Sequence, residues 1–214
     1  DSLVKDKTGD MWKDPMVLQF ANDMQNLQAK GYLSKKIAGN KYPAGQQDLA
    51  LGKVAMYLNG TWLPNEIAAT AGPDFKWGSF QFPDVPNGNG KGGQQGLSFG
   101  AQGLLVNKNS KNVPAAFELV KYLAGKKAQE GMASQALAIP ATVDTTWPAP
   151  LAEAEVAFQN AKVNMPWGFG IDNGADFSTG TVIPVFMELA TGKLSPDAYV
   201  AKMSAEAKKF YAGK

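Results

Sequence analysis

The sequence predicts an α/β fold, in which short apolar strands alternate with amphipathic helices. Met16, Phe20, Met24 and Leu27 recur at helical spacing, which indicates a helix with one apolar face. The run Val54–Leu58 is apolar and partly β-branched, as expected of a buried strand. The chain has 214 residues and no internal repeat, a length suited to one large domain or two small ones.

The first third of the chain starts with a polar, irregular stretch and continues as helices. Asp14 is the expected N-cap of the first helix, Pro15 its first residue, and Gly31 the residue that ends it. A short helix is expected at Gln46–Lys53, immediately before the Val54–Leu58 strand.

The turn Asn59–Trp62 breaks that strand, and Pro64–Ala69 begins the next helix. Lys76–Phe82 alternates weakly between apolar and polar residues, so we expect a strand that ends at Pro83. Pro86–Gly96 is rich in glycine and is expected to be a flexible connection.

The second half continues the mixture of strands and helices. A strand is expected at Leu97–Val106, followed by helices at Pro114–Ala124 and Lys126–Gln135. The residues of the first of these helices that should point inward are Phe117, Val120 and Leu123.

The last third begins with a Pro-rich crossing, and the chain ends in a helix capped by Ser195. Inward-facing positions on that last helix are Tyr199, Met203 and Phe210. The expected segments before it are an extended Ala136–Pro150, a helix at Leu151–Val163, a long loop at Met165–Phe177 and a helix at Thr179–Thr191 that contains Pro184.

The composition excludes several classes of function. The chain has no Cys and no His, so it cannot contain a Ser-His-Asp triad, a thiol nucleophile or a His-ligated metal within itself. Its formal net charge is +2 and the lysines are scattered, so we expect no nucleic-acid partner. The longest apolar runs are too short to span a bilayer. We expect no cofactor and no metal.

The first candidate for function is the turn Asn59–Trp62. In open α/β sheets, ligands bind at the carboxyl ends of strands. The flat face of Trp62 can stack on a sugar ring there, and Asn59, Gly60 and Thr61 can contact its hydroxyl groups. The alternative is a Trp that fills the core beneath the next helix, and position alone favours that alternative slightly.

The second candidate is the loop Met165–Phe177. Its aromatic residues Trp167 and Phe177 lie near Asp172, a combination of flat apolar faces and hydrogen-bond acceptors that suits ligands rich in hydroxyl groups. A loop held in place by its own hydrophobic residues is about equally consistent with this pattern.

Two other patterns point to chemistry less strongly. Glycosidases use pairs of acidic residues, and two such pairs occur here: Glu153 with Glu155, and Asp172 with Asp176. The pattern favours the simpler interpretation that these four residues are acids on the solvated surface. The glycine loop lacks the strand, lysine and helix context of a phosphate-binding loop.

Three segments resemble the carbohydrate-binding receptors of bacterial ABC importers, the maltose-binding-protein-like group. "GKVAMYLNGTW" resembles the family phrase that ends in a sugar-stacking Trp, which places Trp62 on that residue. "GLLVNKNSKNVPAAFELVKYLAGKKAQEGMASQALAIPA" resembles the strand, turn and paired helices of the family. "ELATGKLSPDAYVAKMSAEAKKF" resembles its last helix.

The resemblance implies a type II periplasmic-binding-protein fold with two lobes. Residues 1–95 and 146–214 would belong to the C-terminal lobe, and residues 96–145 would be a strand–helix–helix excursion into the N-terminal lobe. The family's receptors are usually much longer, so the missing N-terminal half is an expected partner. Gln102 falls where relatives carry a ligand-facing residue, and we include it among the expected ligand contacts.

The implied function is a non-enzymatic one. The receptor would bind a mono- or oligosaccharide between its lobes and deliver it to the permease subunits of the transporter. It would lie outside the cytoplasm, in the periplasm or anchored by lipid to the outer face of the cytoplasmic membrane. The alternatives are a carbohydrate-active enzyme of the glycoside hydrolase type and a receptor of the same fold for a polyamine or ferric iron.

Overall fold

The structure is a computed structural model that describes residues 3, 6–86, 95–165 and 174–212. It is mixed and rich in helices, and its described strands form one small parallel sheet. The elements in chain order are η1 (Asp10–Lys13), α2 (Pro15–Ala29), η2 (Ile37–Gly39), α3 (Ala44–Ala50), α4 (Leu63–Ala71), β1 (Gly96–Ser98), α5 (Val113–Ala124), α6 (Lys126–Ala136), η4 (Ala149–Leu151), α7 (Ala152–Gln159), β2 (Val163–Met165), α8 (Ala175–Phe177), η6 (Ser178–Val182), α9 (Ile183–Ala190) and α10 (Pro196–Tyr211).

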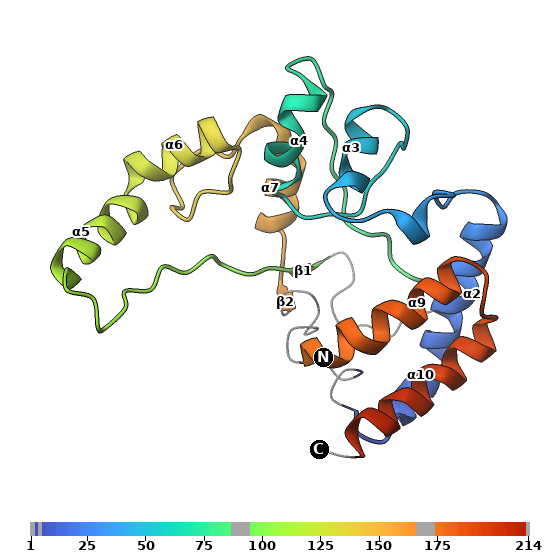
Figure 1. Cartoon of the computed structure of the whole chain (residues 1–214). Helices are drawn as coiled ribbons and strands as arrows, with labels where there is room; N and C mark the ends of the chain where they lie inside the picture. The colour runs from blue at the N-terminus through green and yellow to red at the C-terminus, as the bar shows by residue number, and fades with distance from the viewer. Residues whose placement is uncertain (1–2, 4–5, 87–94, 166–173, 213–214) are drawn as a thin grey trace.

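The hydrophobic core lies where α2, α9 and α10 pack together with η1 (Figure 1). Phe177 is fully buried at its centre, and its ring centroid lies 6.3 Å from that of Trp12 and 5.1 Å from that of Phe210. The other buried members of this core are Ala21, Val185, Leu189, Tyr199, Met203 and Ala207. Tyr199 and Met203 therefore point inward as predicted, and Phe210 packs against the core.

The predicted helix caps of the core are confirmed. The backbone N–H of Met16 donates to Asp14 Oδ1 at 2.8 Å, and that of Ala198 donates to Ser195 Oγ at 3.2 Å. Each bond satisfies a donor that the first turn of the helix leaves without a partner. Gly31 follows α2 with φ of 73°, the left-handed conformation that glycine adopts without strain.

Replacing Ser195 with alanine should lower the free energy of unfolding by about 1 kcal/mol, because the donor of Ala198 loses its acceptor. Ser134→Ala is the matched control: Ser134 Oγ donates to the carbonyl of Glu130 within α6, a bond that does not help the helix. Urea denaturation followed by circular dichroism measures both, and equal effects of the two substitutions would contradict the assignment.

The predicted helix at Thr179–Thr191 is confirmed as part of a longer helical run from α8 to α9. Pro184 cannot donate to the carbonyl four residues earlier, and its ring would clash with that carbonyl in a regular helix. The preceding turn, η6, is a wider π-helix, which accommodates the proline.

The predicted strands are mostly wrong. β1 pairs in parallel with β2, with Leu97 opposite Asn164, so only the first residues of the expected strand Leu97–Val106 form one. The stretches Val54–Leu58 and Lys76–Phe82 are not strands. A strand requires a hydrogen-bonding neighbour, and the described part of the chain supplies none for these two.

Helix boundaries near the sheet also differ from the prediction. α7 ends at Gln159 rather than at Val163, which instead begins β2. The end of the loop predicted at Met165–Phe177 is helical, since α8 covers Ala175–Phe177.

The chain exposes far more surface than a compact protein of its mass. It exposes 14508 Å², whereas a folded monomer of 22.8 kDa exposes about 9,600 Å². Large apolar residues are exposed both on helices and on extended stretches that pair with no described strand. Those on the extended stretches include Met56, Leu58, Phe80, Phe82, Leu104 and Leu105.

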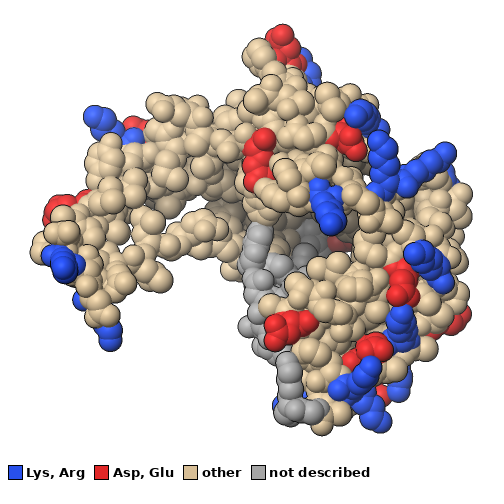
Figure 2. Space-filling view, viewed as in Figure 1, with Lys and Arg blue, Asp and Glu red and all other residues tan. Residues whose placement is uncertain are grey.

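Helices α5 and α6 form an arm that projects from the rest of the molecule (Figures 1 and 2). Among the helices described, α5 packs mainly against α6. The expectation that Phe117 points into a core is wrong, because 53% of this residue is exposed. Among the described elements, α6 is the main one that packs against this helix.

The charges show no concentrated patch on the face seen in Figure 2, where lysines and acidic residues are interspersed over the body of the molecule. Over the residues described, no helix combines the length and the apolar character needed to cross a bilayer.

Candidate functional site

The candidate site is built around the turn that leads into α4. Asn59 Oδ1 accepts from the backbone N–H of Gly60 at 2.8 Å, and Asn59 Nδ2 donates to Gln46 Oε1 at 3.4 Å. Gln46 is buried in α3, so this bond ties the turn to that helix. The Leu63 N–H then donates to the Gly60 carbonyl at 3.1 Å and starts α4.

Trp62 lies at the N-cap position of α4, with its ring folded back over Gly60. A Cβ atom at Gly60 would lie 2.0 to 2.4 Å from three ring atoms, so only glycine allows this packing. Trp62 keeps 38% of its surface exposed, whereas Leu63 and Ile67 on the other face of the helix are buried. The indole is therefore an apolar plane at the surface beside a polar turn.

The other predicted ligand contacts do not gather here. Gln102 is exposed and lies on the segment that leads from β1 away to α5 (Figure 1). Phe177 is fully buried in the helical core, which favours the alternative interpretation that it anchors its loop. We therefore leave Phe177 out of the proposed site. Trp167 and Asp172 lie outside the described residues.

Sequence reasoning missed a polar group on the same side of α4. Tyr42 Oη donates to Glu66 Oε1 at 2.5 Å, across 24 residues of chain. This hydrogen bond is the main reason that the pKa of Tyr42 is raised, with smaller effects from desolvation and from the charges of Glu66 and Tyr57. Nothing in the stretch Gly39–Pro43 indicates that Tyr42 has a hydrogen-bond partner as distant in the sequence as Glu66.

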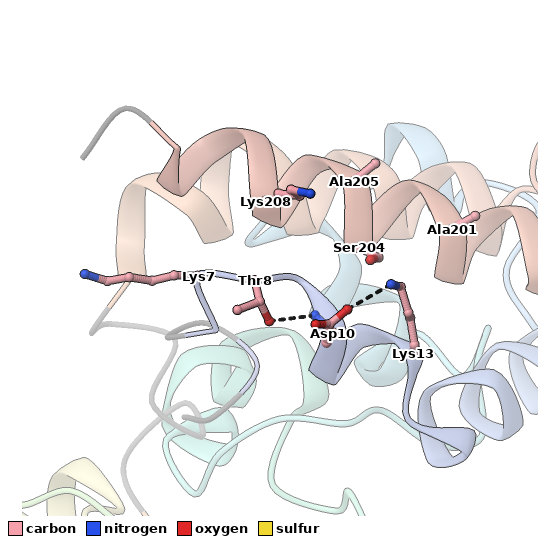
Figure 3. Close-up of a pocket in the computed structure, with 8 residues that line it drawn as sticks. All are labelled: Lys7, Thr8, Asp10, Lys13, Ala201, Ser204, Ala205 and Lys208. Atoms are coloured by element: carbon pink, nitrogen blue, oxygen red, sulfur yellow. Dashed lines mark hydrogen bonds and ion pairs between the residues drawn. The ribbon is translucent and has the colours of Figure 1, made fainter.

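Two surface grooves lie elsewhere. One, of about 580 Å³, separates the start of the chain from α10 (Figure 3). Its acidic group, Asp10, is already bound to Lys13 at 2.8 Å, and Lys7 points away from the other labelled side chains (Figure 3). Its lining residues are Lys7, Thr8, Asp10, Lys13, Ala201, Ser204, Ala205 and Lys208. Open geometry and an internally paired acid make this groove a poor ligand site.

The second groove, of about 700 Å³, lies at the carboxyl end of α4. Its walls include Phe75 and Trp77, whose ring centroids are 4.7 Å apart, and the chain around Pro150. It is lined mostly by apolar residues and does not include Trp62. Of its lining residues only Lys76 is charged, so it offers few polar groups to orient a ligand.

The acidic residues considered for hydrolysis have structural contacts. Glu153 Oε2 accepts from the backbone N–H of Ser79 at 3.0 Å, and Glu155 Oε1 accepts from Gln159 at 3.2 Å. Within the described ranges, no three acidic residues lie close enough together to hold a metal ion.

The geometry is that of a surface able to hold a ligand, with an aromatic plane next to hydrogen-bonding groups. The family model described as bacterial extracellular solute-binding protein matches residues 3–130, more than half of the chain. The chain therefore belongs to the family of bacterial extracellular solute-binding proteins. No curated protein and no solved structure matches it.

Membership of this family indicates the general location, function and partners of the chain. The chain is an extracytoplasmic solute-binding component of a transporter, and its partners are a solute and the transporter that takes up the solute. Proteins of this family bind their solutes and are generally not enzymes.

Proposed function

We propose that the solute is a sugar or oligosaccharide and that Trp62 is the residue on which it stacks. The observation that carries the proposal is the surface-exposed indole at the start of α4, folded over Gly60 and adjoining Asn59. An aromatic face matches the apolar C–H face of a pyranose, and the amide of Asn59 and the backbone of Gly60 and Thr61 suit its hydroxyl groups.

The receptor has two lobes, of which this chain supplies the C-terminal one and a part of the other. Residues 1–95 and 146–214 form the C-terminal lobe, and residues 96–145 reach into the N-terminal lobe. The excess exposed area of the chain, about 5,000 Å² over a compact monomer, supports this division, since it is more than the roughly 1,000–2,500 Å² that each partner of an obligate interface buries. The projecting α5–α6 arm is consistent with a segment that belongs to a second lobe.

The sugar lies between the lobes, which close on it by a hinge motion. Gln102, carried by the excursion, contacts it from the second lobe, and Trp167 and Asp172 contact it from the C-terminal lobe. The closed receptor docks on the permease subunits of an ABC importer, in the periplasm or anchored by lipid at the outer face of the cytoplasmic membrane.

Replacing Trp62 with alanine in the complete receptor should weaken sugar binding by about 2 kcal/mol or more, roughly thirtyfold, because the substitution removes the stacking plane. Titration calorimetry measures the dissociation constant. Trp77→Ala is the matched control, since Trp77 lies in the groove at the other end of α4. A dissociation constant that is unchanged in Trp62→Ala would contradict the assignment.

The enzyme alternative makes a different prediction. A glycoside hydrolase would release reducing ends from oligosaccharides, whereas a receptor only gains thermal stability when it binds them. The hydrogen bonds of Glu153 and Glu155 to nearby groups favour the receptor. Release of reducing ends by the purified receptor, lost in Glu153→Gln, would establish the alternative.

A further inference from the structure

The polar group around Glu66 has hydrogen-bonding capacity that the protein does not use. A carboxylate offers about four acceptor positions on its two oxygens. Among the described residues Glu66 accepts one side-chain hydrogen bond, from Tyr42 to Oε1, and has no lysine within ion-pair distance. Glu66 and Tyr42 are both exposed, so a ligand can reach the acceptor positions.

A second pair of polar side chains faces the same region. A Cβ atom on Gly45 would lie 2.9 Å from both Tyr57 Oη and Asn40 Nδ2, so these two groups converge above Gly45 in the first turn of α3. Because glycine has no side chain, the Tyr57 hydroxyl and the Asn40 amide can occupy the space above Gly45. Tyr57 is 37% exposed, and its hydroxyl donates to no described residue. The charge of Tyr57 also contributes to the raised pKa of Tyr42, as expected of neighbouring phenols.

Helix α4 joins this group to Trp62. Glu66 follows Trp62 by four residues, and its N–H donates to the Trp62 carbonyl at 3.2 Å, so both side chains lie on one face of the helix. The Asn59–Gln46 hydrogen bond holds α3 against the turn before α4. One side of the α3–α4 pair thus presents an indole, two phenols, an amide and a carboxylate.

We propose that Tyr42, Tyr57 and Glu66 form a hydroxyl-binding subsite that continues the Trp62 surface, with Glu66 accepting from two neighbouring hydroxyl groups of one sugar ring. The inference rests on the proposed function and adds the residues that determine which sugar is bound. A carboxylate accepts from two adjacent hydroxyls at once, and such charge-assisted bonds are stronger than neutral ones. Tyr57 and Asn40 supply the donors that a ring oxygen or a further hydroxyl requires.

A neutral ligand fits this subsite better than a polyamine. Over residues 40–66 the acidic side chains are Asp48 and Glu66, and Asp48 is paired with Lys53 at 3.5 Å. A single carboxylate would leave the second and third charges of a polyamine without a partner. A sugar ring has many donors and no charge, as this group of side chains requires.

The test uses the complete receptor and titration calorimetry with glucose, galactose, xylose, maltose and spermidine as probes. Glu66→Gln should weaken binding of the recognised sugar by about tenfold or more, and Tyr57→Phe by about fivefold. Glu118→Gln and Tyr122→Phe, at exposed positions on α5, are the matched controls and should leave the dissociation constant unchanged. Melting curves establish that each variant is folded.

Monodeoxy derivatives of the recognised sugar make the test specific to Glu66. Removing a hydroxyl that Glu66 binds should weaken binding to the wild type but have much less effect in Glu66→Gln, because the two changes remove the same contact. If the wild type binds sugar and depends on Trp62, but Glu66→Gln and Tyr57→Phe match their controls, the subsite is overturned and the proposed function stands. If the wild type binds no sugar, or binds spermidine alone, both are overturned.

Discussion

Replacing Phe177 with alanine should lower the free energy of unfolding of the α2–α9–α10 core by about 3–5 kcal/mol. The ring is fully buried and contacts Trp12, Phe210 and Tyr211 at centroid distances of 6.3, 5.1 and 5.7 Å. The substitution removes both the buried apolar surface and the aromatic contacts, and it leaves a cavity that three packed helices cannot close. A loss of this size is a large fraction of the stability of a typical domain.

Urea denaturation followed by circular dichroism measures the loss, and the near-ultraviolet signal, to which Trp12 and the other aromatic residues contribute, reports on tertiary packing. Phe117→Ala is the matched control, because it removes the same side chain from an exposed position on α5. We expect it to change the free energy of unfolding by less than about 1 kcal/mol. Equal losses in the two variants would show that Phe177 does not belong to the core.

The helices could be predicted from the sequence because their signals are local. Asp14 and Ser195 cap helices through bonds to residues two and three positions later, and such spacing is visible in the chain itself. A helix through Pro184 was predicted, although nothing in the sequence indicated that a π-turn would accommodate the proline.

The strands could not be predicted in the same way, because a strand depends on a neighbour that is distant in sequence. Val54–Leu58 has the composition of a buried strand but no partner among the described residues, and Leu58 remains 81% exposed. Composition indicates which segments can be strands. Only pairing determines which of them become strands.

The candidate site was predictable only in part for a related reason. Trp62 was found from its turn and from a motif within one segment. The contact between Tyr42 and Glu66 joins α4 to the stretch before α3, and no spacing rule connects them. Phe177 shows the converse difficulty, since an aromatic residue beside acids has the same local pattern whether it binds a ligand or fills a core.

The chain of 214 residues should by itself bind sugars poorly or not at all, with an affinity roughly a hundredfold or more below that of the complete receptor. A ligand held between two lobes loses water on both faces, and its hydrogen bonds strengthen as water leaves. In the proposed receptor, the turn at Trp62 and the adjoining subsite cover one face of the ligand only. The other face would stay in water, and no closure would trap the ligand.

Calorimetry with a panel of mono- and oligosaccharides measures this difference, with Trp62→Ala of the same chain as the control for heat unrelated to the site. Micromolar binding by the chain, shown by mass to be free of any second polypeptide, would contradict the two-lobe mechanism.

Hydrogen exchange tests whether a second polypeptide covers the excess exposed surface of the chain. If a second polypeptide restores binding, it should also protect the amides of Val54–Leu58 and Lys76–Phe82 from hydrogen exchange, because these stretches would then acquire the strand neighbours that the described residues do not supply. Restored binding without that protection would mean that the partner covers another face.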